Sequence, residues 1–313
     1  MRNMTTAPFI HTPITTQYIY LCMSIALIPP IIYAVFFYGI SALILIGFSA
    51  FFSLLVGGFV GSNRDYASLN DGIILALMLP PGTSIYTAAV GVIVAEFFVK
   101  RIFGSMGNYF VAPAAFGRIV IQLMMPSDLG GFSGTLGEDW FGVANLFSFG
   151  GKTASIPSVD SYSFSEIIVG RFSSYIGVGC TLLIILGAIS LIRSHAIKLH
   201  ASGIFLVFAL VGKFITGIDE GIIPDLKSTC IYMFTSGVVF AAVYLMTDPV
   251  TTSMYGWAAV LEGIIAGVAL PVVSTKCSGI IAVCVTVVII NLFDSSIRYF
   301  MDILRRCGRT GDA

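Results

Sequence analysis

The sequence contains few charged residues for its length. Only 10% of its 313 residues are charged, the formal net charge is zero, and 57% are hydrophobic. A soluble domain carries roughly a quarter charged residues, so this composition excludes an ordinary soluble domain. A zero net charge also gives no reason to expect a nucleic-acid partner. We therefore predict an all-α protein that crosses a lipid bilayer many times.

Histidine is scarce, and the cysteines are scattered. The three histidines, His11, His195 and His200, fall in terminal or loop segments, so we predict no catalytic triad and no catalytic residue. The six cysteines form no C-x-x-C pair and no Cys/His cluster, so we expect buried thiols and no bound metal, iron–sulfur cluster or haem.

Apolar runs long enough to cross about 30 Å of hydrocarbon divide the chain into two halves. The expected elements lie near residues 18–38, 40–61, 71–81, 84–99 and 109–125, and near 174–192, 201–217, 230–249, 256–272 and 278–300. We expect a first membrane repeat over 1–125, a polar loop over 126–173, a second repeat over 174–300 and a tail over 301–313. Because five crossings per half is an odd number, the halves should form an inverted repeat.

The distribution of Lys and Arg predicts the orientation in the membrane. If both termini are cytoplasmic, the segments on the cytoplasmic side hold more Lys and Arg residues than the segments on the outer side, and they include Arg305, Arg306 and Arg309. The loop 126–173 is then extracytoplasmic and the tail 301–313 cytoplasmic. We expect a multi-pass protein of the cytoplasmic (inner) membrane. Its first apolar run is too long for a signal peptide and is expected to be retained.

Proline interrupts the third element of each half. The residues at the two breaks are Asp71, Gly72, Pro80 and Pro81 in the first and Thr247, Asp248 and Pro249 in the second. A broken helix at membrane depth must be buried in protein or line a polar cavity. We expect the two breaks to meet in a narrow constriction, where freed carbonyls and Asp248 suit a hard cation such as Na⁺. The alternative is that Asp248 only caps the next helix.

Four further ionisable residues lie within apolar segments. Glu262 has no partner nearby in the sequence and is a candidate for lining an ion or proton path. Glu96 and Lys100 have the spacing of an ordinary helical ion pair. Arg118 follows a break at Pro113 and could pair with a carboxylate or with the phosphate of a cofactor.

Three segments, in order along the chain, carry a resemblance to a known family. They are Asp71-Gly72 leading to Leu79-Pro80-Pro81, the stretch from Lys100 through Gly104, Gly107 and Asn108 to Pro113-Ala114, and Ser236-Gly237 followed by Thr247-Asp248-Pro249-Val250-Thr251. The chain resembles the D subunit of the Rnf complex and the related B subunit of the Na⁺-pumping NADH:quinone reductase. The short N-terminus favours the Rnf D subunit.

The resemblance implies a non-autonomous membrane subunit of an ion-translocating oxidoreductase. The family complex moves electrons between reduced ferredoxin and NAD⁺ and couples this transfer to transport of Na⁺ or H⁺. Its partners are other membrane and peripheral subunits. The implied fold is similar to urea and ammonium transporters, and the implied cofactor is FMN or riboflavin.

Family members attach FMN through a phosphoester to a threonine of the extracytoplasmic loop, within an S-x-A-T motif. This chain has no such motif between 126 and 173, and the nearest candidates are Thr135, Thr153 and Ser155. The alternative is a loop without covalent flavin, with flavin held among the broken helices near Arg118 and Tyr244. The family asparagine before Pro113 is replaced by Ala112.

Two other functions are compatible with the sequence. One is a passive solute channel or transporter on the same scaffold without redox chemistry. The other is a structural anchor for neighbouring subunits, in which Asp248 would have no part in transport.

Overall fold

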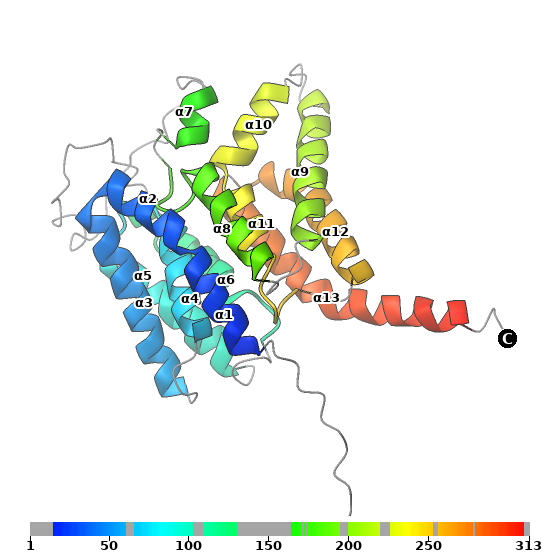
Figure 1. Ribbon diagram of the computed structural model, residues 1–313, viewed down its shortest axis with the longest axis horizontal. Coiled ribbons are helices and arrows are strands. Elements are labelled where there is room, and N and C mark those ends of the chain that lie inside the picture. Colours follow the sequence, from blue (N-terminus) through cyan, green and yellow to red (C-terminus); the bar gives the residue numbers. More distant parts are fainter. Residues whose placement is uncertain are drawn as a thin grey trace, which may run out of the picture.

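The computed structural model describes residues 15–60, 66–102, 109–129, 164–170, 172, 174–194, 200–219, 226–252, 256–277 and 279–309. Within these ranges every regular element is a helix (Figure 1). The helices are α1 (Thr16–Ala26), α2 (Ile28–Tyr38), α3 (Ile40–Val60), α4 (Tyr66–Leu77), α5 (Ile85–Ile93), the π-helical η1 (Val94–Arg101), α6 (Pro113–Met124), the 3₁₀ turn η2 (Pro126–Leu129), α7 (Phe164–Val169), α8 (Thr181–Arg193), α9 (His200–Asp219), α10 (Leu226–Thr235), α11 (Val238–Tyr244), α12 (Gly256–Ser274) and α13 (Ile280–Arg309).

Within the described parts of the chain, four helical segments are long and apolar enough to cross a membrane. They are Thr16–Tyr38, formed by α1 and α2, Ile40–Phe59, Gly256–Ser274 and Ile280–Met301. The pair α10 and α11, bent by 53° at a short break, would make a fifth. A helix needs about 20 residues to cross 30 Å. The all-α expectation is confirmed for the described residues, and these segments fit a multi-pass membrane protein, while the ten elements and the inverted repeat stay predictions.

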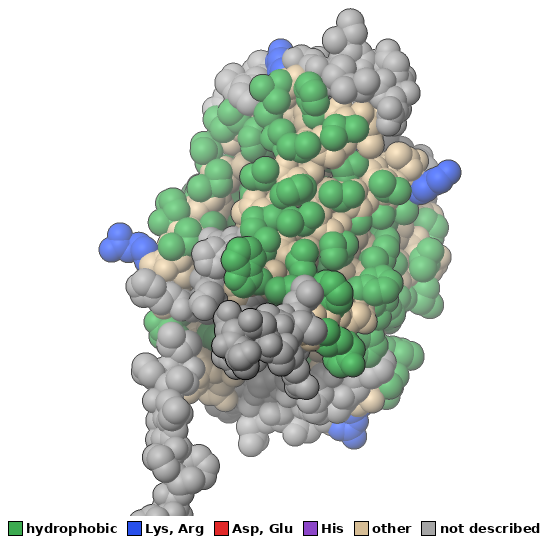
Figure 2. Space-filling view, turned by 90° about the vertical axis from the view of Figure 1, so that its right-hand side faces the viewer, with side chains coloured by type: hydrophobic (Ala, Val, Ile, Leu, Met, Phe, Trp, Pro, Cys, Tyr) green, Lys and Arg blue, Asp and Glu red, His purple; other side chains and the backbone are tan. Residues whose placement is uncertain are grey.

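The outer surface is apolar. Large hydrophobic side chains such as Phe36, Phe59 and Val272 are more than half exposed. Figure 2 shows one face covered with hydrophobic side chains, with Lys and Arg only at its margins. Such a surface suits lipid tails or apolar neighbouring subunits and is unsuited to water.

The interior contains two short helices that end inside the protein. All seven residues of α11 are buried, as are most residues of α4. A helix that is apolar on all sides is typical of a protein core. Because α4 and α11 end away from solvent, their terminal backbone groups need partners inside the protein.

Local sequence explains where these short helices begin and end. Gly237 has φ +82°, a left-handed conformation that glycine adopts without steric cost, and it separates α10 from α11. After the first break, Ser84 caps α5, and its hydroxyl and amide both bond to the Asp128 carboxylate at 2.6 and 3.2 Å. Asp128 also accepts from the Thr87 hydroxyl. This carboxylate fixes the start of α5 against the end of α6.

The two halves of the chain contact each other through α8 and where α6 packs against α13. Helices α1 and α2 pack on one side of α8, and α11 packs on another. The N-terminal end of α1 and the C-terminal end of α13 both lie in the lower part of the molecule in Figure 1, whereas α7 and α10 lie at its upper side. The central location of α8 brings α4 of the first half and α11 of the second into the same core.

Candidate functional site

The first break lies beyond the end of α4, and its carbonyl groups are occupied. The Leu77 carbonyl accepts from the Gly177 amide at 2.8 Å, and the Leu79 carbonyl accepts from the Ile176 amide at 3.0 Å. The Pro80 carbonyl accepts from both the amide and the hydroxyl of Thr83. These carbonyls were expected to be free for a cation, and that expectation is wrong, because donors of the same chain already bond to them.

Arg118 occupies a further carbonyl of this break, that of Met78. Its side chain is almost completely buried, and its Nε donates to the Met78 carbonyl at 3.1 Å. Its Nη1 donates to the Gln122 side-chain oxygen at 3.2 Å, and its guanidinium carbon lies 5.9 Å from the centre of the Tyr175 ring. Within the described residues, Arg118 therefore stabilises the break through oxygen acceptors and an aromatic face, and the carboxylate partner expected from sequence is not observed.

The second break ends in a turn that carries Asp248. Helix α11 ends at Tyr244, and the Thr247 hydroxyl donates back to the Val243 carbonyl at 2.5 Å. Thr247 is buried and Pro249 is half-buried. Since α12 begins only at Gly256, Asp248 is not the N-cap of the next helix, and that alternative is wrong.

The Asp248 carboxylate is buried among hydroxyl groups. Oδ1 accepts from the Tyr20 hydroxyl at 3.0 Å and from the Tyr109 hydroxyl at 3.4 Å, and the two phenols lie 2.8 Å apart. Oδ2 accepts from the Thr251 hydroxyl at 3.1 Å, and Oδ1 also receives the Val250 amide at 3.4 Å, which closes a short Asx-type turn. The carboxylate is thus held by donors from three separate segments of the chain.

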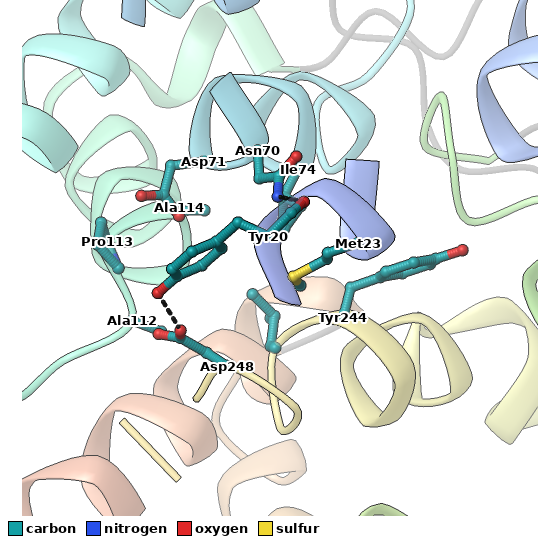
Figure 3. A pocket seen from close by; sticks show the side chains of 11 residues that line it. Tyr20, Met23, Asn70, Asp71, Ile74, Ala112, Pro113, Ala114, Tyr244 and Asp248 are labelled. Atoms are coloured by element: carbon teal, nitrogen blue, oxygen red, sulfur yellow. Dashed lines mark hydrogen bonds between the residues drawn. The ribbon is translucent and has the colours of Figure 1, made fainter. Parts of the chain in front are cut away.

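Asp248 and Asp71 line the same small cavity. Its volume is about 10 Å³, which is room for about one water molecule. The lining comes from α1, α4, the start of α6 and the end of α11: Tyr20, Met23, Asn70, Asp71, Ile74, Ala112, Pro113, Ala114, Tyr244, Leu245 and Asp248. Figure 3 shows the Tyr20 ring between the two acidic side chains, with its hydroxyl on Asp248. One carboxylate from each half of the chain therefore faces a single cavity.

Behind Asp71 lies a buried charge cluster. The Lys100 ammonium contacts Asp71 Oδ2 at 2.6 Å, Glu96 Oε1 at 3.0 Å and the Ser68 hydroxyl at 3.1 Å. Glu96 accepts from the hydroxyls of Ser53 and Ser68 at 2.8 and 2.9 Å. The expected pair of Glu96 and Lys100 is confirmed. It lies in the protein interior, however, and Lys100 also binds Asp71.

The two proline turns do not line the cavity. Asp71 lies in the first half of α4, whereas Pro80 and Pro81 follow the last residue of that helix, Leu77. The rise along the helix from Asp71 to Leu77 is about 9 Å, so the prolines lie farther along the chain than that. The cavity includes Asp71 and Asp248 and does not include the prolines. The middle of α4 thus faces the end of α11 at this cavity, and the expected constriction between Pro80 and Pro249 stays a prediction.

Two other predicted residues occupy different places. A Cβ at Gly72 would lie 2.6 Å from the Ser49 carbonyl and 2.7 Å from the Ser53 Cβ, so this glycine permits the close contact of α4 with α3. Glu262 is buried in α12 and does not line the cavity. Its assignment to an ion path stays a prediction.

The flavin predictions separate into two groups. Thr135, Thr153 and Ser155 lie outside the described residues. Tyr244 lines the cavity, and its hydroxyl donates to the Ala26 carbonyl at 2.8 Å. A flavin needs a pocket of hundreds of cubic ångströms, so this cavity does not fit one, and the buried Arg118 is enclosed by its own partners.

Sequence reasoning missed three polar residues of the site. Tyr20 and Tyr109 were not singled out, because single aromatic residues are common in membrane proteins. Asn70 donates to the Tyr20 carbonyl at 2.7 Å and accepts from the Ser24 hydroxyl at 2.6 Å, which ties α4 to α1. The one available signal was the consecutive pair Asn70-Asp71 within an apolar helix.

The described residues contain no group of three His, Cys, Asp or Glu side chains that could hold a metal ion. Of the cysteines, Cys22, Cys180 and Cys284 are buried free thiols.

Comparison with known proteins gives a consistent family. The NQR2, RnfD, RnfE family model matches residues 3–304. The B subunit of the Na⁺-translocating NADH-quinone reductase of Pseudomonas aeruginosa strain LESB58 is 25% identical over 279 residues, 83% of this chain and 68% of the relative. The corresponding B subunit of Chromohalobacter salexigens is 28% identical over 201 residues, 63% of this chain and 48% of the relative. The B subunit of Stutzerimonas stutzeri is 27% identical over 229 residues, which are 69% of this chain and 56% of the relative.

The matched region thus spans between about half and two thirds of the length of these relatives. The match to the family model covers nearly the whole of this chain. The chain belongs to the NQR2, RnfD, RnfE family.

Proposed function

We propose that this chain is the cation-conducting membrane subunit of a redox-driven pump, and that Na⁺ passes through the cavity between Asp71 and Asp248. The family and the names of the relatives, which are Na⁺-translocating reductase subunits, support a role in such a pump. The observation that carries the proposal is the meeting of two carboxylates, one from each half of the chain, at one buried cavity.

The chemistry of the cavity suits a hard monovalent cation. Hard cations take oxygen ligands. The cavity has two carboxylates, and the Tyr20 hydroxyl and the Asn70 side chain lie beside them. Its size accommodates a dehydrated ion or a single water molecule and excludes larger solutes.

The local charge also favours a cation. The cavity and the cluster behind it contain three carboxylates, those of Asp71, Glu96 and Asp248, and one ammonium, that of Lys100. Buried carboxylates without compensating charge are costly, so an entering cation is stabilised. The C-terminal end of α11 carries a partial negative charge, which adds to this preference.

Ion entry has a defined consequence for the site. A cation that coordinates Asp248 Oδ1 competes with the Tyr20 and Tyr109 hydroxyls, which now donate to that oxygen. Each phenol has one O–H group, so once released from the carboxylate one of them can donate to the other, whose oxygen lies 2.8 Å away. We therefore propose that these tyrosines close the site between ion passages.

The test is the cation dependence of turnover in the assembled complex. The complex is reconstituted in proteoliposomes, and turnover is measured against NaCl at constant ionic strength kept with choline chloride. Asp248→Asn should raise the Na⁺ concentration for half-maximal turnover about tenfold or more, because a charged ligand becomes neutral. Complex assembly should be unchanged.

Asp294→Asn is the matched control. Asp294 is a mostly buried carboxylate in α13 that pairs with Arg298 at 2.6 Å and does not line the cavity. It should leave the Na⁺ dependence unchanged. Normal Na⁺ dependence in the Asp248 variant would remove the cavity from the transport path. Solute flux without any redox substrate would instead favour a passive channel.

We also propose the finer family assignments for the regions outside the cavity. The chain is proposed to be a Rnf-type D subunit with ten membrane elements in an inverted repeat, with both termini cytoplasmic and with other subunits as partners. The meeting of the middle of α4 with the end of α11 at one cavity supports the inverted repeat. The choice between Rnf and Nqr types is tested by comparing ferredoxin:NAD⁺ with NADH:quinone activity of the purified complex.

Covalent flavin is proposed on the loop 126–173, at Thr153 or Ser155 or at Thr135. Bound flavin would supply one-electron transfer to the complex. Mass spectrometry of peptides from this loop should find one of them heavier by an FMN phosphoester. Unmodified peptides with full coverage of the loop would refute covalent attachment.

A further inference from the structure

The ammonium of Lys100 is fully engaged in the protein interior. It donates hydrogen bonds to Glu96 Oε1 at 3.0 Å and to the Ser68 hydroxyl at 3.1 Å, and it forms an ion pair with Asp71 Oδ2 at 2.6 Å. The side chain is 4% exposed. Lys100 thus provides a positive charge directly behind one of the two carboxylates of the cavity.

The two carboxylates that share Lys100 are held differently. Glu96 has two other donors, because the Ser53 hydroxyl bonds to Oε1 and the Ser68 hydroxyl to Oε2. Within the described residues, the ionic or hydrogen-bonding partner shown for Asp71 is Lys100 alone. If Lys100 were absent, Glu96 would still accept hydrogen bonds from two hydroxyl groups. Asp71 would instead need another cation.

Access to the two carboxylates also differs. Asp71 lines the cavity, and neither Lys100 nor Glu96 does so. A cation in the cavity can therefore reach Asp71 without contacting Lys100 or Glu96. The lysine side chain ends in a point charge on a flexible stem of four carbons, so it can move between acceptors without movement of the backbone.

We propose that Lys100 is a tethered cation that competes with Na⁺ for Asp71. The ammonium binds Asp71 when the cavity is empty. When Na⁺ enters, the ammonium withdraws to Glu96 and Ser68, and it returns to Asp71 when Na⁺ leaves. Lys100 is a positioning residue by this account, and it sets both the affinity of the cavity and the release of the ion. The inference rests on the proposed function.

Two variants should change the apparent Na⁺ affinity in opposite directions. Glu96→Gln leaves the ammonium with Asp71 as its one carboxylate, so competition increases and the half-maximal Na⁺ concentration should rise about tenfold. The double variant Glu96→Gln, Lys100→Gln removes one charge of each sign and with it the competitor. Its half-maximal Na⁺ concentration should fall by about the same factor.

The matched control removes another ion pair whose members are four residues apart on a helix, at a place away from the cavity. Asp294 and Arg298 form an i,i+4 ion pair in α13 that does not line the cavity. Asp294→Asn together with Arg298→Gln should leave the Na⁺ dependence unchanged. A purely structural role of Lys100 predicts a loss of assembled complex without opposite shifts in the half-maximal Na⁺ concentration.

The outcomes distinguish the inference from the function on which it rests. If the wild-type complex shows no Na⁺ dependence, or Asp248→Asn does not alter it, the proposed function fails. If Asp248→Asn alters it and the Glu96 and Lys100 variants do not shift it in opposite directions, only the tethered cation fails. Should the double variant not assemble, Lys100→Arg replaces it. A guanidinium binds a carboxylate through two donors, so this variant should raise the half-maximal Na⁺ concentration, and an unchanged value would overturn the inference.

Discussion

Replacing Gly72 by alanine tests how Asp71 is held at the cavity. The added methyl group would lie 2.6 Å from the Ser49 carbonyl and 2.7 Å from the Ser53 Cβ. The nearest atom belongs to the backbone of α3, so the contact can be relieved only if α3 and α4 move apart. Overpacking of this kind costs about 1–3 kcal/mol.

The cost of the close contact must be separated from the change in helix propensity when glycine becomes alanine, and the chain offers a control variant for this. Alanine is favoured over glycine in a helix by about 0.5–1 kcal/mol. Gly47 lies in α3, and a Cβ there would meet nothing within 4 Å. Gly47→Ala therefore reports propensity alone, and the difference between the two variants isolates the contact at about 1–3 kcal/mol.

The assay is thermal unfolding of the purified protein in detergent. A difference of this size corresponds to a lower melting temperature for Gly72→Ala by on the order of 2–6 °C relative to Gly47→Ala. The Na⁺ dependence of turnover should also weaken in Gly72→Ala, since Asp71 is the preceding residue. Equal melting temperatures would refute the close packing of α3 and α4 at this point.

Two further changes test the breaks themselves. Gly237→Ala places a side chain at φ +82° and should destabilise the protein by about 1–2 kcal/mol, whereas Gly256→Ala, at an open position, should not; thermal unfolding of both variants measures this. Arg118→Met leaves the Met78 carbonyl without its donor and should lower the melting temperature by more than Arg298→Met, which removes a half-exposed side chain; equal effects would show that the first break does not depend on Arg118.

The coarse architecture could be predicted from the sequence because hydrophobicity alone determines it. Long apolar runs and scarce charge indicated a helical membrane protein. The Glu96–Lys100 pair was also predictable, because its members lie one helical turn apart. Proline located the two breaks, although α4 ends three residues before Pro80 and α11 ends five before Pro249.

The partners across the fold could not be predicted, because they depend on how distant segments pack. Nothing in the sequence pairs Tyr20 with Asp248, or Lys100 with Asp71. The assumption that proline frees carbonyls for an ion ignored donors from elsewhere, and the Ile176 and Gly177 amides supply them. The prolines therefore mark the two breaks without determining where the helices end, and the acidic side chains line the candidate site.

The occupied carbonyls at the first break have a consequence for the speed of the pump. The carbonyls of this joint are already bonded to Gly177, Ile176 and Arg118, so the proposed ion passage does not call for unwinding of the main chain there. In the proposed mechanism, the barrier would be the rotation of a phenol away from an acid. Side-chain rotations are orders of magnitude faster than collective helix movements. The gate would then keep pace with electron delivery, and the slow step of each cycle would lie elsewhere in the complex.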